Sequence, residues 1–148
     1  RAASPDNLGL VKTIIASAVE TSMPLIEASH HQLQVTLDEQ PLPLKTRHGE
    51  LVSVPYTVEI NDVVMSAVQQ QPSDEIFRRG RDQFDRLYLD GKTAPRVMAI
   101  SIHPYLTGVP HRIKYLEMLY DHILSHEGVV TWTGAEILDW YRAQVFKY

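Results

Sequence analysis

The stretch that decides the fold is residues 96–102, which read RVMAISI. A nearly continuous apolar run of this length is typical of a strand buried on both faces, as in a parallel sheet. The next residues, 103–108, read HPYLTG. In α/β sheets and barrels, functional groups gather where strands end. The run therefore predicts both an α/β architecture and the position of a site.

Strand and helix patterns alternate around this run. Before it, residues 51–54 form a short apolar run, and a helical pattern extends from Ser73, a predicted N-cap, to Gly91, a predicted stop. After it come a predicted helix over about 112–125, a strand over 128–132 and the sequence TGAE (133–136), a capping box that opens a last helix. Three strand–helix units in series predict parallel strands and a partial (β/α) barrel, since a closed barrel needs roughly 200 residues or more.

The N-terminal part of the chain has a different pattern. Apolar residues at helical spacing predict a long helix over about 8–26, interrupted at Pro24, and alternation predicts a strand over 33–37. Residues 38–50 contain two Pro and five charges, which is typical of a connection. We therefore divide the chain into residues 1–44 and 45–148. Three parallel strands leave two open edges, so we expect a homo-oligomer, most simply a two-fold dimer.

Composition excludes several classes of protein. The chain has 148 residues, no Cys and a net charge of −4. Without Cys there is no disulfide framework, thiolate metal site or cysteine nucleophile. The basic residues form no stripe for nucleic acid, and no apolar run approaches the roughly 18 residues of a membrane span. Because residues near Arg1 do not resemble a secretion signal, we expect a cytoplasmic protein, and a start at Arg1 is expected of a fragment or a processed product.

His103 is the first candidate for chemistry because it follows the central strand. An imidazole there can donate or accept a proton near neutral pH, and Pro104 fixes the chain direction after it. A structural histidine that hydrogen-bonds a loop carbonyl is the alternative.

Four blocks of sequence resemble one known family. They are LVSVPYTVEIND (51–62), DQFDRLYLDG (82–91), PRVMAISIHPYLTGVPHRIKYLE (95–117) and VVTWTGAEILDWYRAQ (129–144). Together they resemble the C-terminal part of the polysaccharide deacetylase family, and within it the allantoinase-like members. The resemblance implies a zinc-type divalent-metal hydrolase on a distorted (β/α) barrel. Such an enzyme deacetylates a carbohydrate amide or opens a ureide such as allantoin.

The resemblance also implies roles for particular residues. His103 matches a late histidine that protonates the leaving nitrogen. Asn61 and Asp62 match a block near the pocket and are candidate substrate ligands, with a solvated turn as the alternative. Apart from the resemblance, Tyr105 and Trp132 are further candidates for substrate contact. Trp132 could line a sugar-binding groove with Trp140 and Tyr141, and packing is the alternative, because aromatic residues around a helix start are typical of it.

The family's metal is held by one Asp and two His, and a second Asp is the base. These residues belong to the N-terminal half of the family's domain, and nothing in residues 1–50 resembles them. We therefore expect this chain alone to bind no stoichiometric zinc and to hydrolyse neither acetylated amino sugars nor allantoin. A catalytically inactive remnant or assembly module is the alternative function.

Two other patterns remain. His122 and His126 stand at i, i+4, the spacing with which two imidazoles on a helix hold one zinc ion. Only Asp121 or Glu127 is evident as a third ligand, and a solvated surface pair is the alternative. Residues 18–37 resemble the start of a sensor histidine kinase ATP-binding domain, without its Asn box or Gly-rich lid. This predicts a join between two gene products and leaves a kinase-derived interaction element as a third function.

Overall fold

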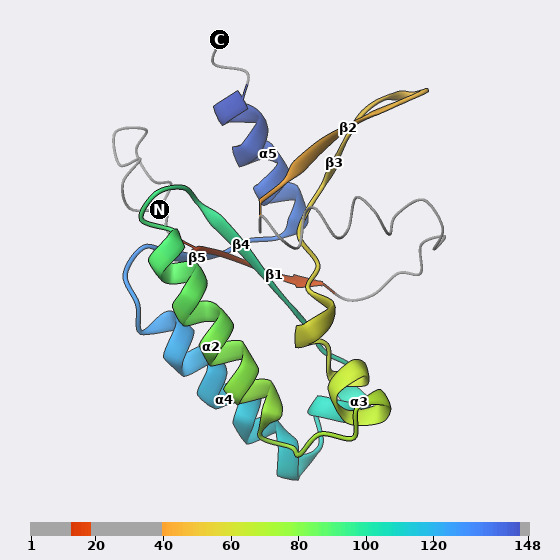
Figure 1. Cartoon of the computed structure of the whole chain (residues 1–148), viewed down its shortest axis with the longest axis vertical. Helices are drawn as coiled ribbons and strands as arrows, with labels where there is room; N and C mark the ends of the chain where they lie inside the picture. The colour runs from red at the N-terminus through yellow and green to blue at the C-terminus, as the bar shows by residue number, and fades with distance from the viewer. Residues whose placement is uncertain (1–12, 19–39, 146–148) are drawn as a thin grey trace.

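The computed structural model describes residues 13–18 and 40–145. Three parallel strands form one sheet in the order β4-β1-β5, with β1 at Thr13–Ala18, β4 at Arg96–Ser101 and β5 at Val129–Thr131. A separate antiparallel hairpin joins β2 (Leu42–Thr46) to β3 (Gly49–Ser53). Figure 1 shows this hairpin near α5, away from α2 and α4. The predicted α/β class is confirmed.

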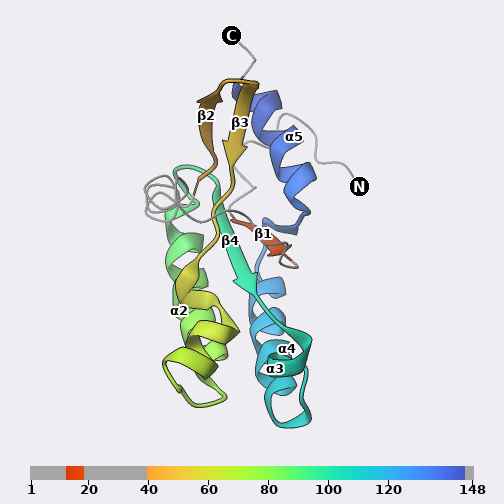
Figure 2. The same ribbon diagram turned by 90° about the vertical axis from the view of Figure 1, so that its right-hand side faces the viewer.

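Helices cover both faces of the sheet. Figures 1 and 2 show α2 (Glu75–Asp90) and α4 (Pro110–Leu124) side by side along it. On β4, Met98 and Ile100 belong to the core formed with these two helices, whereas Val97 packs with Ile137 of α5 (Gly134–Val145). Successive side chains of a strand point to opposite faces, so α5 covers the other face. The prediction that this strand is buried on both faces is confirmed.

Close packing joins α2 to α4. Gly80 of α2 lies against Leu119 of α4, and a Cβ built on Gly80 would lie 2.4 Å from Leu119 Cδ2. Leu119 and Phe84 are fully buried beside this contact. The absence of a side chain at position 80 therefore sets how closely the two helices approach.

The predicted helix boundaries are largely found. The backbone N–H of Gly91 donates to Leu87 O at 2.7 Å and closes α2, as predicted. The capping box of α5 is confirmed, because the N–H of Thr133 donates to Glu136 Oε2 at 2.7 Å and the N–H of Glu136 donates to Thr133 Oγ1 at 3.3 Å. The start of α2 differs from the prediction: its N-cap is Asp74, not Ser73, and no side chain caps it.

The long helix predicted over residues 8–26 is wrong where the structure describes it. Residues 13–18 form β1, the middle strand, with Thr13 opposite both Arg96 and Val129. A short apolar run fits either a helix or a buried strand, and pairing with two neighbours decides between them. The remainder of that prediction and the predicted strand over 33–37 lie outside the described residues.

The connection predicted over 38–50 is also corrected. It contains β2 and the start of β3, and residues 51–53 end β3 in the hairpin instead of starting the parallel sheet. The three parallel strands are therefore β1, β4 and β5 in the part of the chain that the structure describes. The predicted division between residues 44 and 45 falls within β2 and stays a prediction. The kinase-like segment lies outside the described residues except for Ala18.

None of the helices within residues 13–18 and 40–145 is long and apolar enough to cross a membrane.

Candidate active site around His103

The C-terminal end of β4 brings two distant segments together. After β3 the chain forms a short helical turn, η1 (Val58–Ile60), and Asn61 then makes a parallel bridge with Ser101, the last residue of β4. Asp62 is followed by a wider helical turn, η2 (Val63–Val68), and His103 is followed by the short helix α3 (Pro104–Thr107). The bridge therefore sets Asp62 beside His103.

Asp62 accepts three hydrogen bonds from the segment after β4. Its Oδ2 accepts from the backbone N–H of His103 at 2.7 Å and from Thr107 Oγ1 at 2.6 Å. Its Oδ1 lies 2.7 Å from Nδ1 of the His103 ring. His103 is the N-cap of α3 with extended backbone, and Pro104 occupies the first helical position, which its fixed φ favours. The chain thus passes from β4 to α3 at His103, the residue whose backbone N–H donates to Asp62.

Burial separates the roles of the two side chains. The Asp62 side chain is 3% exposed and the His103 side chain 18% exposed. A carboxylate is buried only where donors satisfy it, and the three bonds from His103 and Thr107 do so. The ring of His103 is thereby held with Nδ1 toward Asp62. The solvated-turn interpretation of Asp62 is wrong, since the residue is buried.

The other candidates occupy different surroundings. Asn61 is also buried, and its Oδ1 accepts from the N–H of Val63 at 2.9 Å, which fixes the start of η2. Tyr105 is 70% exposed, and its ring lies edge-on to that of His103 with centroids 5.6 Å apart. Asn61 therefore fixes the backbone next to Asp62, and Tyr105 lies on the solvent-exposed side of His103. Their roles in substrate binding stay predictions.

Trp132 lies in a different cluster. It packs with Val97 and Ile137, and its ring is 6.2 Å from that of Trp140. These contacts agree with a packing role for Trp132, and its contact with a substrate stays a prediction.

A cavity of about 10 Å³ is lined by Asp62, Thr107 and Arg112 together with residues of η2 and of the start of α2. A space of this size holds about one water molecule, which is too little for a sugar or a ureide. The small cavity is therefore not itself a pocket for either compound.

The residues around His103 do not have the composition of a metal site. Both oxygens of Asp62 already accept hydrogen bonds, and the group contains one imidazole. A catalytic zinc takes three protein ligands. A metal ion at this position would therefore need ligands from beyond the described residues.

The structure adds two residues that the sequence analysis missed. Thr107 bonds Asp62, and its only signal in the sequence is its place one helical turn after His103. Asp85 of α2 lies 2.7 Å from Nε2 of His122 and supplies a third polar group to the pair at 122 and 126. No sequence pattern connects Asp85 with α4, because packing of the two helices alone brings them together.

No family model matches the chain. A curated Schizosaccharomyces pombe protein assigned to the polysaccharide deacetylases is 40% identical over 109 residues, which cover 69% of this chain and 34% of that protein. Among solved structures, a Pseudomonas aeruginosa PAO1 protein assigned as a polysaccharide deacetylase matches with a TM-score of 0.67 and 28% identity, over 74% of this chain and 37% of that one. The Puue allantoinase matches with a TM-score of 0.68 and 29% identity, over 75% and 37%. This chain thus spans about a third of the length of the relatives that it matches.

Proposed function

Because part of this chain is a segment of the polysaccharide deacetylase family, we propose that it supplies the proton-transfer half of a hydrolase site for a carbon–nitrogen bond. The observation that carries the proposal is the buried carboxylate of Asp62 on Nδ1 of His103, at the end of β4. The substrate class is a carbohydrate N-acetyl group or a ureide such as allantoin. His103 is the catalytic residue, and Asp62 is the positioning residue.

Each atom of the pair has a defined task in this proposal. Asp62 holds one tautomer of the His103 ring and stabilises the imidazolium form through its negative charge. The proton on Nε2 passes to the nitrogen that leaves when the carbon–nitrogen bond breaks. Thr107 keeps the carboxylate oriented, since its hydroxyl donates to the oxygen that also accepts from the backbone of His103.

The resemblance implies a divalent metal ion, which would polarise the carbonyl group and activate water. The described residues around His103 do not fit such an ion, so its ligands would come from another polypeptide segment. The whole activity accordingly needs more chain than residues 51–144.

A second candidate is an inactive assembly module. It is favoured by the surroundings of His103, where the described residues offer one imidazole and a carboxylate whose two oxygens already accept hydrogen bonds. For the isolated chain we expect no hydrolysis of acetylated amino sugars or allantoin, and turnover that a chelator abolishes would contradict this expectation.

A chimera tests the catalytic proposal. Residues 51–144 replace the matching segment of the Schizosaccharomyces pombe relative, and the chimera is assayed on acetylated chitooligosaccharides and on allantoin. His103→Ala should lower kcat by about 10²–10⁴-fold with KM little changed. Asp62→Asn should lose part of the same factor, because an amide no longer fixes the required tautomer.

His111→Ala is the matched control, since this histidine is exposed on α4. Its kcat should equal that of the parent chimera. A loss below about threefold on His103→Ala, in a chimera that is active and folded, would return His103 to the structural interpretation.

A further inference from the structure

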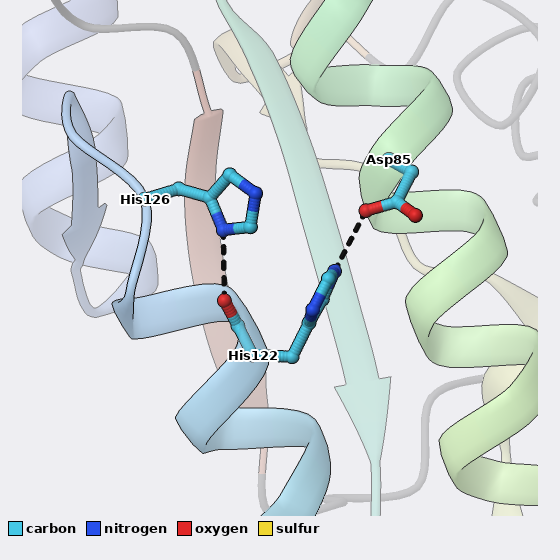
Figure 3. A group of neighbouring side chains, drawn as sticks. All are labelled: Asp85, His122 and His126. Carbon is cyan, nitrogen blue, oxygen red and sulfur yellow. Dashed lines mark hydrogen bonds and ion pairs between the residues drawn. The ribbon is translucent and has the colours of Figure 1, made fainter.

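We propose that Asp85, His122 and His126 form a binding site for a divalent transition-metal ion of the zinc type, which ties α2 to α4. One ligand atom from each residue lies within 4.8 Å of the others. Within residues 13–18 and 40–145, these three residues form the one group of three or more His, Asp or Glu side chains that lie close enough to hold a metal ion. Figure 3 shows His122 of α4 facing Asp85 of α2, with His126 beside them on the turn that follows α4. The site is independent of His103, because it lies toward the end of α4 that is farther from α3.

The hydrogen bonds already orient the ligand atoms. Nδ1 of His126 lies 2.8 Å from the carbonyl oxygen of His122 and therefore carries the proton. In the neutral ring, Nε2 is then the nitrogen whose lone pair can bind a metal ion. A histidine ligand whose other nitrogen donates to a backbone carbonyl is the arrangement found around bound zinc.

His122 and Asp85 form a short contact between α4 and α2 that a metal ion would take over. Nε2 of His122 lies 2.7 Å from Oδ1 of Asp85. Two ligands of a tetrahedral zinc ion, each about 2.0–2.1 Å from the metal, lie about 3.3 Å apart. The pair would have to open by about half an ångström, which rotation of the Asp85 side chain can supply, since it is 49% exposed.

Aromatic rings pack against both imidazoles and leave the site partly exposed to solvent. Phe84 packs edge-on to both imidazoles, with centroids 5.6 Å from His122 and 4.9 Å from His126. Tyr88 packs on His126 at 4.9 Å, and its hydroxyl donates to Glu127 O at 3.1 Å. These contacts hold the rings in place before an ion arrives, and the 27% exposure of the His122 side chain leaves a path from solvent.

The donor set matches the proposed ion. Two imidazoles and one carboxylate are a three-ligand set of the kind that binds Zn²⁺ with a water molecule in the fourth position. Such an ion would confirm the zinc interpretation of the His122 and His126 pair, with Asp85 as the third ligand. It would also replace the expectation that this chain alone binds no stoichiometric zinc.

Zinc titration of the chain of residues 1–148, without a polyhistidine tag, tests the proposal. Isothermal titration calorimetry should show one Zn²⁺ per chain, and at 100 times the dissociation constant the melting temperature should rise by roughly 5–10 °C. His122→Ala, His126→Gln and Asp85→Asn should each weaken binding by about tenfold or more. Asp85→Asn separates this site from binding by His122 and His126 alone, without a ligand from α2.

Two variants serve as controls. His111→Ala removes an exposed histidine of α4, and the double variant His30→Ala/His31→Ala removes the adjacent histidines near the N-terminus; both should bind Zn²⁺ as the parent does. Replacement of Zn²⁺ by Co²⁺ should give visible absorption bands that disappear in His122→Ala. Zinc binding that is absent in the parent, or equal in the parent and in folded Asp85→Asn, would overturn the site.

Discussion

Asp62 holds His103 at two atoms, by a 2.7 Å hydrogen bond from the backbone N–H and a 2.7 Å contact with Nδ1 of the ring. The two residues are 41 positions apart in the sequence. The first contact fixes where the backbone leaves β4, and the second fixes the ring. The position and the tautomer of His103 therefore depend on one buried carboxylate.

The hydroxyl of Thr107 completes this group, and its loss should be measurable as stability. Thr107→Val keeps the shape of a buried side chain but removes the donor to Asp62 Oδ2. We expect the free energy of unfolding in urea to fall by about 1.5–3 kcal/mol, the usual contribution of a hydrogen bond to a charged group. Thr107→Ser keeps the hydroxyl and should lose clearly less. Equal losses in the two variants would show that the methyl group, not the hydrogen bond, stabilises the site.

Gly80→Ala should destabilise the protein although alanine favours helices. The new Cβ would lie 2.4 Å from Leu119 Cδ2, and Leu119 is fully buried and has little room to move. Overpacking of this kind costs about 1–3 kcal/mol, which exceeds the gain of about 1 kcal/mol in helix propensity. Gly134→Ala is the control, because nothing lies within 4 Å of its Cβ position. Thermal unfolding of both variants gives the comparison, and a Gly80→Ala melting temperature at or above that of the parent would refute close packing of α2 on α4.

Glu136 should titrate below its ordinary range. Hydrogen bonds from the backbone N–H and the hydroxyl of Thr133 lower the pKa of its carboxyl group. Since the folded-state pKa lies below the unfolded one, the contribution to stability is present above the ordinary glutamate pKa and is lost as the pH falls through the folded-state value. Thr133→Ala should raise the pKa of Glu136 in an NMR titration, and Thr131→Ala, a strand residue nearby, should leave it unchanged. The rise should be partial, because alanine keeps the backbone N–H that lowers the pKa most. An unchanged pKa in Thr133→Ala would show that the Thr133 hydroxyl does not donate to Glu136.

The open edges of the sheet lead us to propose a two-fold dimer. In the described part of the chain, β4 pairs with β1 on one side and meets the bridge at Asn61 on the other, and β5 pairs through three residues. Exposed strand edges favour pairing with a second chain. Light scattering at high micromolar concentration should give the mass of a dimer. A monomer that unfolds cooperatively would mean that one chain covers its own edges.

Local sequence determined those elements whose signals lie within a few residues. The apolar run of β4, the glycine that closes α2 and the capping box of α5 were all predicted, because backbone geometry and side-chain burial depend there on immediate neighbours. His103 was predicted as a candidate because its position follows from the end of the strand. The resemblance to a family was also present in the sequence as contiguous blocks.

Only the tertiary structure decided which distant segments meet. Residues 13–18 have a pattern that suits a helix, and pairing with β4 and β5 makes them the middle strand. The local sequence around Asp62 is compatible with a solvated turn, but the bridge between Asn61 and Ser101 places Asp62 in the interior. Asp85 meets His122 only because α2 packs on α4. In each case the deciding free energy comes from burial and hydrogen bonding between residues far apart in the chain, and no local pattern records those contacts.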